Sequence, residues 1–461
     1  MKRLVLFLIF SLSYFGLFAE SVSREDIHRQ AVSACMRVAE EDFSTKAYTI
    51  TPMLEEGDTC YYVVQFEPEG FALIAADDRV QPLIGYSVTG IFELDKAPEC
   101  LQSALELRSK KIQFLKRDKS FKKHIDWEKQ TLRSFNQAER IAPLIKVYWG
   151  QDYDYAKYCP TTPNGQKTLV GCVAVAMGQA MTVLRHPFRP KGHVGYGATN
   201  VGYIEIDFDE ETPYNWDKIL SGADKSDEVA RLLYHCGVAT RMQYGVKASS
   251  AYCTIAAENI ISHFSYHKDS VKYYRKRSPY YTATGGIGSI TITDKEWQDM
   301  IVNELKQGRA ILHSLGSQRH AVNIDGYDGV NAFHFNMGWG GFNNMYYTFE
   351  KMIYDKSNEP KTWEDSLMEM IIGLVPDTRS STDIESVAQS LETPLQVNGS
   401  LLRLKSPEKG ICRVYDLSGA LLQTDPVVAG DNEILLKTKG LCILSIDCNG
   451  KVASHKIHVK E

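Results

Sequence analysis

The sequence predicts an α+β protein built from several domains, with helices preceding strands in its largest block. This block, 141 to about 375, carries helical patterns and then glycine-rich strand runs, at 173–184, 226–242, 294–308 and 310–350. The flanking regions show short strand patterns separated by Gly, Pro and Asp. A chain of 461 residues is too long for one ordinary core, so we expect two to four domains.

The first nineteen residues have the pattern of a secretory signal peptide, predicted at 1–19. Lys2 and Arg3 precede an apolar stretch, and Ala19 offers a small residue for cleavage. A retained anchor helix is the alternative, but the stretch is short for crossing a bilayer. No later stretch is long and apolar enough to span one, so we expect a secreted or cell-surface protein without stable membrane insertion.

Residues 20–140 form a predicted β-rich unit. The patterns predict a short helix within 21–41, three strands of a small antiparallel sheet at 60–66, 70–77 and 82–88, and a helix from about Leu101 to Leu115. The segment 116–140 is then rich in Lys and Arg and poor in aliphatic residues. It is either a polar helix face or an exposed segment where the chain is cut, and we favour the second.

The C-terminal region predicts a small β-sandwich. Short strand patterns recur between turns at 400–406, 410–419, 432–437 and 440–459. We place a linker at 377–390 and the sandwich at 391–461.

Composition excludes several functional classes. The net charge of −5, together with the lack of a basic helix with interleaved aromatics, argues against a nucleic-acid partner. We find no zinc-ligand spacing and expect no metal and no cofactor. The ten cysteines are irregularly spaced without a CxxC pair, so no disulfide framework follows.

Cys172 is the first candidate for chemistry. It follows Gly171 and opens a run of helix formers that Pro187 ends. At a helix N-terminus, unpaired N–H groups stabilise a thiolate and can donate to a developing oxyanion. A buried structural cysteine is an equally good interpretation of this stretch alone.

A cysteine nucleophile needs a base, and the segment 319–342 supplies candidates. Two predicted strands flank Asp328-Gly329, a strong hairpin signal. Folding about this turn brings His320 roughly opposite Asn336, whose amide could orient the imidazole. His334 is the competing base, and polar residues on the outer face of a hairpin are the structural alternative.

Two further residues complete the candidate site. Trp339 lies in GWGG and could shield a His–Asn hydrogen bond from water. Gln151 lies in a loop-like stretch ahead of the cysteine helix and could complete an oxyanion hole with the Cys172 N–H.

The chain resembles the streptopain family of papain-like cysteine proteases, including interpain-like members from Bacteroidota. The resemblance rests on GCVAVAMGQAM (171–181), RHAVNIDGYDG (319–329), FHFNMGWGG (333–341), VYWGQ (147–151), ETPYNWDKIL (211–220) and ATRMQYGVKASS (239–250). It implies a papain-like fold at 141–376, with Cys172 as nucleophile and His320, not His334, as base. It also implies that Asn336 orients the base and that Gln151 completes the oxyanion hole.

The resemblance extends to the substrate cleft. In the family the 239–250 segment borders the cleft, which makes Ser249 and Ser250, together with Trp339, candidate substrate-binding residues. The chain departs from the family at Met337, where streptopain carries a second tryptophan.

The resemblance also implies a zymogen. Family members carry a propeptide that blocks the active site, so 20–140 is expected to inhibit the enzyme until a cut between about Lys116 and Arg140. The segment 440–460 is similar to sorting domains of the type IX secretion pathway, which implies a secretion-machinery partner. An adhesin module is the alternative for this domain.

Together these observations predict a cysteine endopeptidase acting on protein or peptide substrates. One alternative is another Cys–His acyl-transfer enzyme of transglutaminase type, which usually orients its histidine with an aspartate. The other is a catalytically silent binding protein or inhibitor on the same fold.

Overall fold

The structure is a computed structural model that describes most of the chain. The described residues are 22–117, 122–128, 139–152, 154–221, 227–275, 280–281, 287–288, 292–314, 320–349, 368–377, 395–416, 421–448 and 451–459. The predicted signal peptide, most of the segment 116–140 and nearly all of the linker 377–390 lie outside them. The chain divides into two compact units, Met1–Pro376 and Asp377–Glu461.

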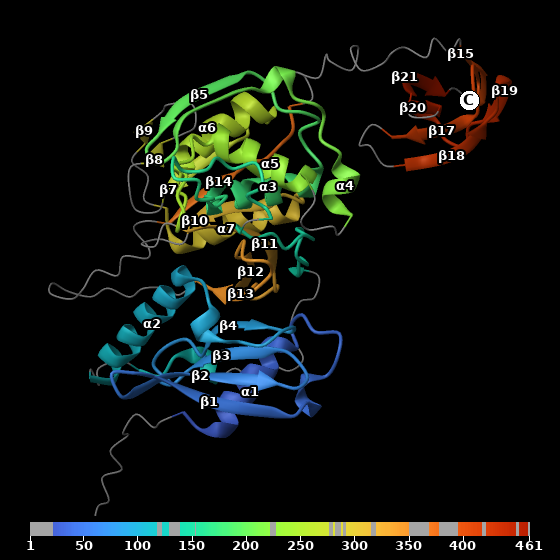
Figure 1. Ribbon diagram of the computed structural model, residues 1–461. Coiled ribbons are helices and arrows are strands. Elements are labelled where there is room, and N and C mark those ends of the chain that lie inside the picture. Colours follow the sequence, from blue (N-terminus) through green and yellow to red (C-terminus); the bar gives the residue numbers. More distant parts are fainter. Residues whose placement is uncertain are drawn as a thin grey trace, which may run out of the picture. The chain divides into compact units, whose positions relative to one another are not determined.

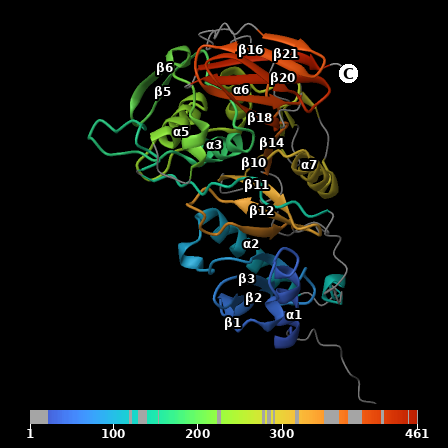
Figure 2. The ribbon, with the colours of Figure 1, turned by 90° about the vertical axis from the view of Figure 1, so that its right-hand side faces the viewer.

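One antiparallel sheet of ten strands runs through the first unit (Figures 1 and 2). Its order is β1-β2-β3-β4-β13-β12-β11-β10-β14-β7. The strands, in this order, are Tyr48–Glu55, Asp58–Phe66, Phe71–Ala75, Leu83–Ser87, Met345–Thr348, Ala332–Asn336, Ala321–Tyr327, Ile311–Ser314, Glu369–Ile372 and Lys272–Arg275. Two short hairpins stand apart: His193–Ala198 with Gly202–Asp207 (β5, β6) and Tyr280–Tyr281 with Ile287–Gly288 (β8, β9).

The continuity of this sheet differs from the sequence prediction. The three strands expected to form a separate small sheet are β2, β3 and β4, and β4 pairs with β13 through Tyr86–Tyr346 and Gly85–Tyr347. We call this β4–β13 junction the seam. Sequence patterns do not reveal it because strand pairing across hundreds of residues is not encoded in local periodicity.

Seven α-helices cover the described sheet. They are α1 (Arg24–Cys35), α2 (Glu99–Arg117), α3 (Cys172–Leu184), α4 (Trp216–Leu220), α5 (Asp227–Ala239), α6 (Cys253–Phe264) and α7 (Asp294–Lys306). The helices expected near 101–115, 173–184, 226–242 and 294–308 are therefore confirmed as α2, α3, α5 and α7. Local chemistry explains their limits: Thr293 and Glu296 form a capping box at the start of α7.

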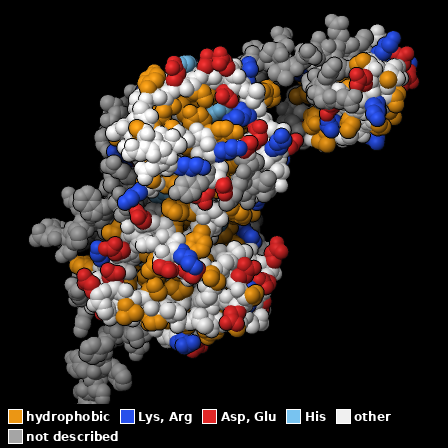
Figure 3. Space-filling model, viewed as in Figure 1, with side chains coloured by type: hydrophobic (Ala, Val, Ile, Leu, Met, Phe, Trp, Pro, Cys, Tyr) orange, Lys and Arg blue, Asp and Glu red, His pale blue; other side chains and the backbone are white. Residues whose placement is uncertain are grey.

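The apolar core lies on both faces of the sheet. On one face, α1 packs with Tyr86, Ala332 and Tyr346, and on the other, Leu101 and Leu105 of α2 share a cluster with Met345. Both clusters cross the seam, so the N-terminal strands and 141–376 fold as one hydrophobic body. On the face shown in Figure 3, charged side chains of both signs are interspersed over the described surface of this unit.

The second unit is the expected β-sandwich. Its two sheets have the orders β15-β16-β19 and β18-β17-β20-β21 and share one apolar cluster. The strands β15 to β21 are Leu395–Asn398, Leu401–Ser406, Gly410–Tyr415, Leu421–Val427, Gly430–Leu435, Gly440–Cys448 and Lys451–Val459. Alternate residues of β20, such as Cys442, Leu444 and Ile446, are buried, as the period of a strand requires. Among the described residues of both units, no helix has the length and apolar character that crossing a bilayer requires.

Candidate active site

Cys172 is the first residue of α3, as the sequence predicted. Gly171 precedes it with φ of 93°, a left-handed conformation that favours glycine. A Cβ at this position would lie 2.6 Å from the Met242 sulfur, so the chain can turn into the helix here only with glycine. This turn places the Cys172 side chain beside the free N–H groups at the helix N-terminus.

Cys172 contacts His320, which directly precedes β11. Burial opposes the thiolate, but the hydrogen bond and charge of His320, with the N–H groups of Ala321 and Val173, hold the pKa of Cys172 below its ordinary value. Burial likewise opposes the imidazolium, yet Cys172 and the Met337 carbonyl raise the pKa of His320 overall. The two shifts together favour a thiolate–imidazolium pair.

Six other described cysteines show the opposite behaviour. Burial raises the pKa of Cys159 to about 12 and that of Cys412 to about 11. It also raises the pKa of Cys35, Cys60, Cys236 and Cys253. Each of these thiols stays protonated at neutral pH, so Cys172 is distinguished by its environment.

The other side of the His320 ring faces the turn that follows β12. Its Nε2 lies 3.0 Å from the Met337 carbonyl oxygen, and the Trp339 Nε1–H donates to the same Nε2 at 3.2 Å. The two contacts exclude each other, since Nε2 needs a proton for the first and a lone pair for the second. The imidazolium therefore binds Met337, and the neutral ring with a bare Nε2 accepts from Trp339.

Asn336 does not lie opposite His320, contrary to the sequence prediction. Its cross-strand partner is Asn323. Its amide Nδ2 donates to the Val147 carbonyl at 3.1 Å, and its Oδ1 accepts from the Gly338 N–H at 3.2 Å. Asn336 thus holds the turn that carries Met337 and Trp339, and no direct contact between Asn336 and His320 is found among the described residues.

The hairpin turn explains the difference in register. We expected the second strand to begin at residue 331, after a turn that carries Asp328-Gly329, but β12 begins only at Ala332. The Asp328 Oδ1 accepts N–H bonds from Val330, Asn331 and Ala332 at 2.8 to 3.0 Å, which stabilises a longer turn. The additional residues displace β12 along β11.

The backbone of Gln151 lies close to the start of α3. Its carbonyl accepts from the Val170 N–H at 3.2 Å, two residues before Cys172. The Trp149 carbonyl accepts from the Gly340 N–H at 3.0 Å. These bonds bring the 147–151 segment, the start of α3 and the Trp339 turn together, although they lie far apart in sequence.

The predicted substrate-binding residues differ in exposure. Trp339 is 47% exposed over His320, and Ser250 is also exposed. Ser249 is buried, with its hydroxyl donating to the Leu169 carbonyl at 2.6 Å and accepting from the Gly245 N–H at 3.0 Å. Its hydroxyl therefore supports the loop beside Gly171.

His334, the competing base, belongs to a different cluster. Its Nδ1 lies 2.6 Å from the buried Asp325 carboxylate, whose other oxygen accepts from the Ile145 N–H at 3.0 Å. His334 and Asp325 thus hold the segment around Ile145, at the start of 141–376, against β11 and β12.

The sequence did not identify two contributors to the site, the Met337 backbone and the Asn344 side chain. The Met337 carbonyl binds His320, and the Met337 N–H donates to the Asn344 Oδ1 at 2.9 Å, which fixes that peptide. A main-chain group carries no signature in sequence, and the asparagine has no distinguishing spacing.

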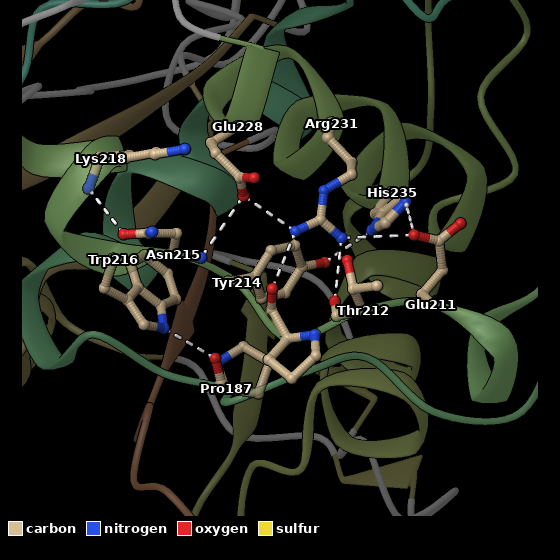
Figure 4. A network of polar contacts seen from close by, with 11 residues as sticks. Pro187, Glu211, Thr212, Tyr214, Asn215, Trp216, Lys218, Glu228, Arg231 and His235 are labelled. Carbon is tan, nitrogen blue, oxygen red and sulfur yellow. Dashed lines mark hydrogen bonds and ion pairs between the residues drawn. The ribbon is translucent and has the colours of Figure 1, made fainter. Parts of the chain in front are cut away.

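A network of polar contacts anchors the segment 211–216 to α5 (Figure 4). Arg231 of α5 pairs with Glu228 at 2.9 Å and with Glu211 at 3.3 Å. His235 lies 2.8 Å from the Tyr214 hydroxyl, and burial lowers the pKa of His235 despite the nearby Glu211 carboxylate. The polar groups of this network bind one another, so it holds the segment against α5.

Metal-binding geometry is not found in the described part of the chain. No cluster there brings together three or more His, Cys, Asp or Glu side chains that could hold an ion.

Comparison with known proteins gives two family matches. Residues 149–347 match the model of the Peptidase C10 family, and residues 21–112 match that of the Spi protease inhibitor. The first match contains Cys172, His320, Asn336 and Gln151, and the second contains α1, β1 to β4 and most of α2.

Individual relatives agree with these matches. The chain is 29% identical over 297 residues to the thiol protease/hemagglutinin PrtT of Porphyromonas gingivalis, covering 60% of this chain and 32% of that protein. It is 24% identical over 319 residues to streptopain of Streptococcus pyogenes, covering 63% of this chain and 74% of streptopain. The chain thus spans about a third of the length of PrtT.

A solved structure shows the same fold. The prointerpain A fragment of Prevotella intermedia superposes with a TM-score of 0.55 at 24% identity, covering 71% of this chain and 99% of the fragment. The α+β papain-like fold with a β-rich N-terminal region is therefore confirmed.

Proposed function

Starting from a Peptidase C10 domain that follows a Spi inhibitor domain, we propose that this chain is a secreted cysteine endopeptidase made as an inactive precursor. The mature enzyme is 141–376, and the inhibitory propeptide is 20–140. One observation carries the proposal: Cys172, at the N-terminus of α3, is paired with His320 and has a lowered thiol pKa.

The proposed reaction is acyl transfer to water through a thioester. The Cys172 thiolate attacks the peptide carbonyl carbon, and the Cys172 N–H and the Gln151 amide donate to the oxyanion. His320 gives its proton to the leaving amine and then takes one from the water that releases the acid. Since Nε2 faces Met337, Nδ1 is the nitrogen left for these transfers.

Asn336 takes part in this scheme as an indirect orienter of His320. Its Oδ1 accepts from the Gly338 N–H, which supports the turn that presents the Met337 carbonyl to the ring. Trp339 and Ser250 are proposed to contact substrate because they are exposed next to the reacting groups. Ser249 shapes the same wall through its backbone partners.

The precursor proposal is supported by the contacts across the seam. Arg37, just after α1, donates to Asp328 and Asn331 at 2.8 Å each, and the Asp328 carboxylate also accepts from Tyr86 at 3.3 Å. Arg108 of α2 donates to the Tyr347 hydroxyl and to the Thr348 carbonyl. The N-terminal region is thus bound to the hairpin that follows His320.

Export is the remaining part of the proposal. The N-terminal pattern 1–19 supports secretion, and the sandwich at 391–461 is proposed to act as a type IX sorting domain. Deleting 380–461 separates this role from that of an adhesin module. A protein retained in the cell supports sorting, whereas a secreted active enzyme that has lost surface attachment supports adhesion.

The nucleophile is tested by labelling with an epoxide inhibitor of papain-like proteases. Purified protein is treated before and after limited trypsin digestion, and the modified residue is located by mass spectrometry. Labelling at Cys172 only after loss of the N-terminal region is the expected result. No labelling of a folded, processed protein would favour the silent-fold alternative.

The reaction class is tested with Cys172→Ala. This variant should lose peptide cleavage and keep the wild-type fold, since an alanine fits the space of the cysteine. Retained cleavage by the purified variant contradicts the proposal. Transfer of an amine onto glutamine without peptide hydrolysis would favour the transglutaminase-type alternative.

A further inference from the structure

Three buried carboxamide side chains lie between the elements that carry the proposed catalytic groups. They are Gln179 on α3, Asn323 on β11 and Asn336 on β12, and each is at most 1% exposed. We call them the carboxamide cluster. Buried amides are costly unless they are hydrogen-bonded, so their partners indicate what they hold in place.

The first link joins α3 to β11. The Asn323 Nδ2 donates to the Ala176 carbonyl at 3.0 Å and to the Gln179 Oε1 at 3.3 Å. Residues 172, 176 and 179 lie on one face of α3, because four and seven residues are close to whole helical turns. Asn323 therefore contacts the face of α3 that carries Cys172. Asn323 itself lies only three residues after His320 in the sequence.

The second link joins α3 and β12 to the 147–151 segment. The Val147 carbonyl accepts from the Asn336 Nδ2 at 3.1 Å and from the Gln179 Nε2 at 3.4 Å. Val147 lies four residues before Gln151. One buried carbonyl is thus shared by α3 and β12.

The cluster adds polar links from the body of α3 to β11 and to the 147–151 segment, beside the β11–β12 ladder and the Val170–Gln151 and Gly340–Trp149 bonds. Because hydrogen bonds are directional, these links constrain the axial position and rotation of α3 more narrowly than apolar packing alone. A nucleophile and its base need this precision, because a displacement of about 1 Å can cost about a hundredfold in rate.

We propose that Gln179 and Asn323 are positioning residues that fix the nucleophile helix against the strand of the base. They act through α3 and β11 and touch no reacting atom. Asn336 completes the cluster by joining the oxyanion segment to the turn that binds His320. This inference rests on the proposed function, since it assigns these residues to the Cys172–His320 pair.

The test uses Gln179→Met and Asn323→Val in the full chain, before and after limited trypsin treatment. Methionine is a flexible helix former close to glutamine in size, and valine suits a strand, so both variants replace the amide with an apolar group. Asn259→Leu is the matched control. It removes a partly buried carboxamide on α6 that donates to the Ala239 carbonyl at 2.6 Å.

The first readout is the pH dependence of Cys172 alkylation by iodoacetamide, which reports the thiolate without any need for turnover. The acid limb is the pH range over which alkylation increases as Cys172 loses its proton. In both variants the midpoint of this limb should move up by about one pH unit, towards that of an ordinary thiol. With a peptide substrate, kcat should fall about tenfold while KM stays within about twofold. Asn259→Leu should leave the acid limb and kcat unchanged at a comparable loss of thermal stability.

The outcomes separate this inference from the proposed function. An acid limb near that of an ordinary thiol in the wild-type chain means that the proposed function fails. If the wild-type chain shows a lowered acid limb of Cys172 alkylation, and both folded variants keep that limb and the wild-type kcat, the positioning role of the cluster is overturned. The proposed function then still stands. Should one variant fail to fold, the other decides, because Asn323→Val breaks the first link and Gln179→Met breaks bonds of both.

Discussion

The seam and the carboxamide cluster are both buried polar junctions, but they are built from different chemistry. At the seam, Arg37 binds Asp328, whose side chain is fully buried, and Arg108 is 5% exposed where it binds β13. In the cluster, every linking side chain is neutral. The seam joins the region that matches the Spi protease inhibitor model to the region that matches the Peptidase C10 model, and the cluster joins parts of the second region to one another.

This difference in chemistry gives a reason to expect that the seam can separate while the carboxamide cluster stays intact. Charged groups regain strong hydration when an interface separates, which offsets part of the lost ion pair. Neutral amides gain less from water, and their hydrogen bonds do not respond to pH or salt. We therefore expect the seam to separate as a unit while the cluster stays closed.

Removing the charge of Arg37 should have the largest effect. In the Cys172→Ala chain, Arg37→Met leaves Asp328 buried without its cation, which costs about 3–5 kcal/mol. Hydrogen exchange of the β4 and β13 amides should accelerate accordingly. Arg79→Met is the control, since Arg79 forms a buried pair with Asp77 inside the N-terminal region.

The contrast between a charged seam and a neutral cluster fails if Arg37→Met and Arg79→Met change hydrogen exchange in the same way. Faster exchange confined to β4 and β13 in Arg37→Met, with none there in Arg79→Met, supports a charge-dependent seam. Equal exchange at the seam in both would mean that the apolar clusters alone hold it.

Arg108→Met should have a smaller effect on the same amides. Its partners, the Tyr347 hydroxyl and the Thr348 carbonyl, are neutral, so no charge is left buried. The expected cost is about 1–3 kcal/mol, the value for an unsatisfied buried acceptor. A larger loss than in Arg37→Met would show that hydrogen bonding, not charge, dominates the seam.

The pH dependence sharpens the contrast inside the site. Peptide cleavage should follow a bell-shaped profile, since Cys172 must be ionised and His320 protonated. The acid limb lies below the ordinary thiol value of 9.0 because the pKa of Cys172 is lowered, and the alkaline limb lies above 6.5 because that of His320 is raised. Beyond each limb, kcat/KM should fall about tenfold per pH unit. A profile that rises steadily through the ordinary thiol value contradicts the ion pair.

Trp339→Phe should have the smallest effect. It removes the Nε1–H that competes for the His320 Nε2, so the protonated ring gains relative stability. The alkaline limb should move upwards by less than about one pH unit, since a single hydrogen bond contributes about 1 kcal/mol. Titration of the His320 ring by NMR measures this shift directly, and a downward shift would refute the competition.

Local features of the sequence predicted much of this structure. Gly171 and the small residues after it predicted the start of α3, and Asp328-Gly329 predicted a hairpin. The long turn was missed because it depends on three N–H bonds to one carboxylate, which no spacing rule contains. The roles of His320 and Asn336 therefore rested on the family resemblance, while their actual contacts required the structure.

The seam was also beyond local inference. Strand β1 was not identified, since its residues are only half-buried or exposed and Pro52 interrupts the pattern. The pairing of β4 with β13 joins residues more than 250 positions apart. Only the packed molecule reveals such a neighbour.

The brevity of the seam ladder has a consequence for the activated enzyme. If activation removes 20–140 as proposed, β13 becomes an edge strand whose residues, Met345 to Thr348, are all buried in the precursor. An open edge with apolar side chains is a template for pairing with other extended chains. Self-association and capture of unfolded segments should therefore compete with proteolysis at high concentration, and the lifetime of the mature protease should depend on how soon that edge is covered again.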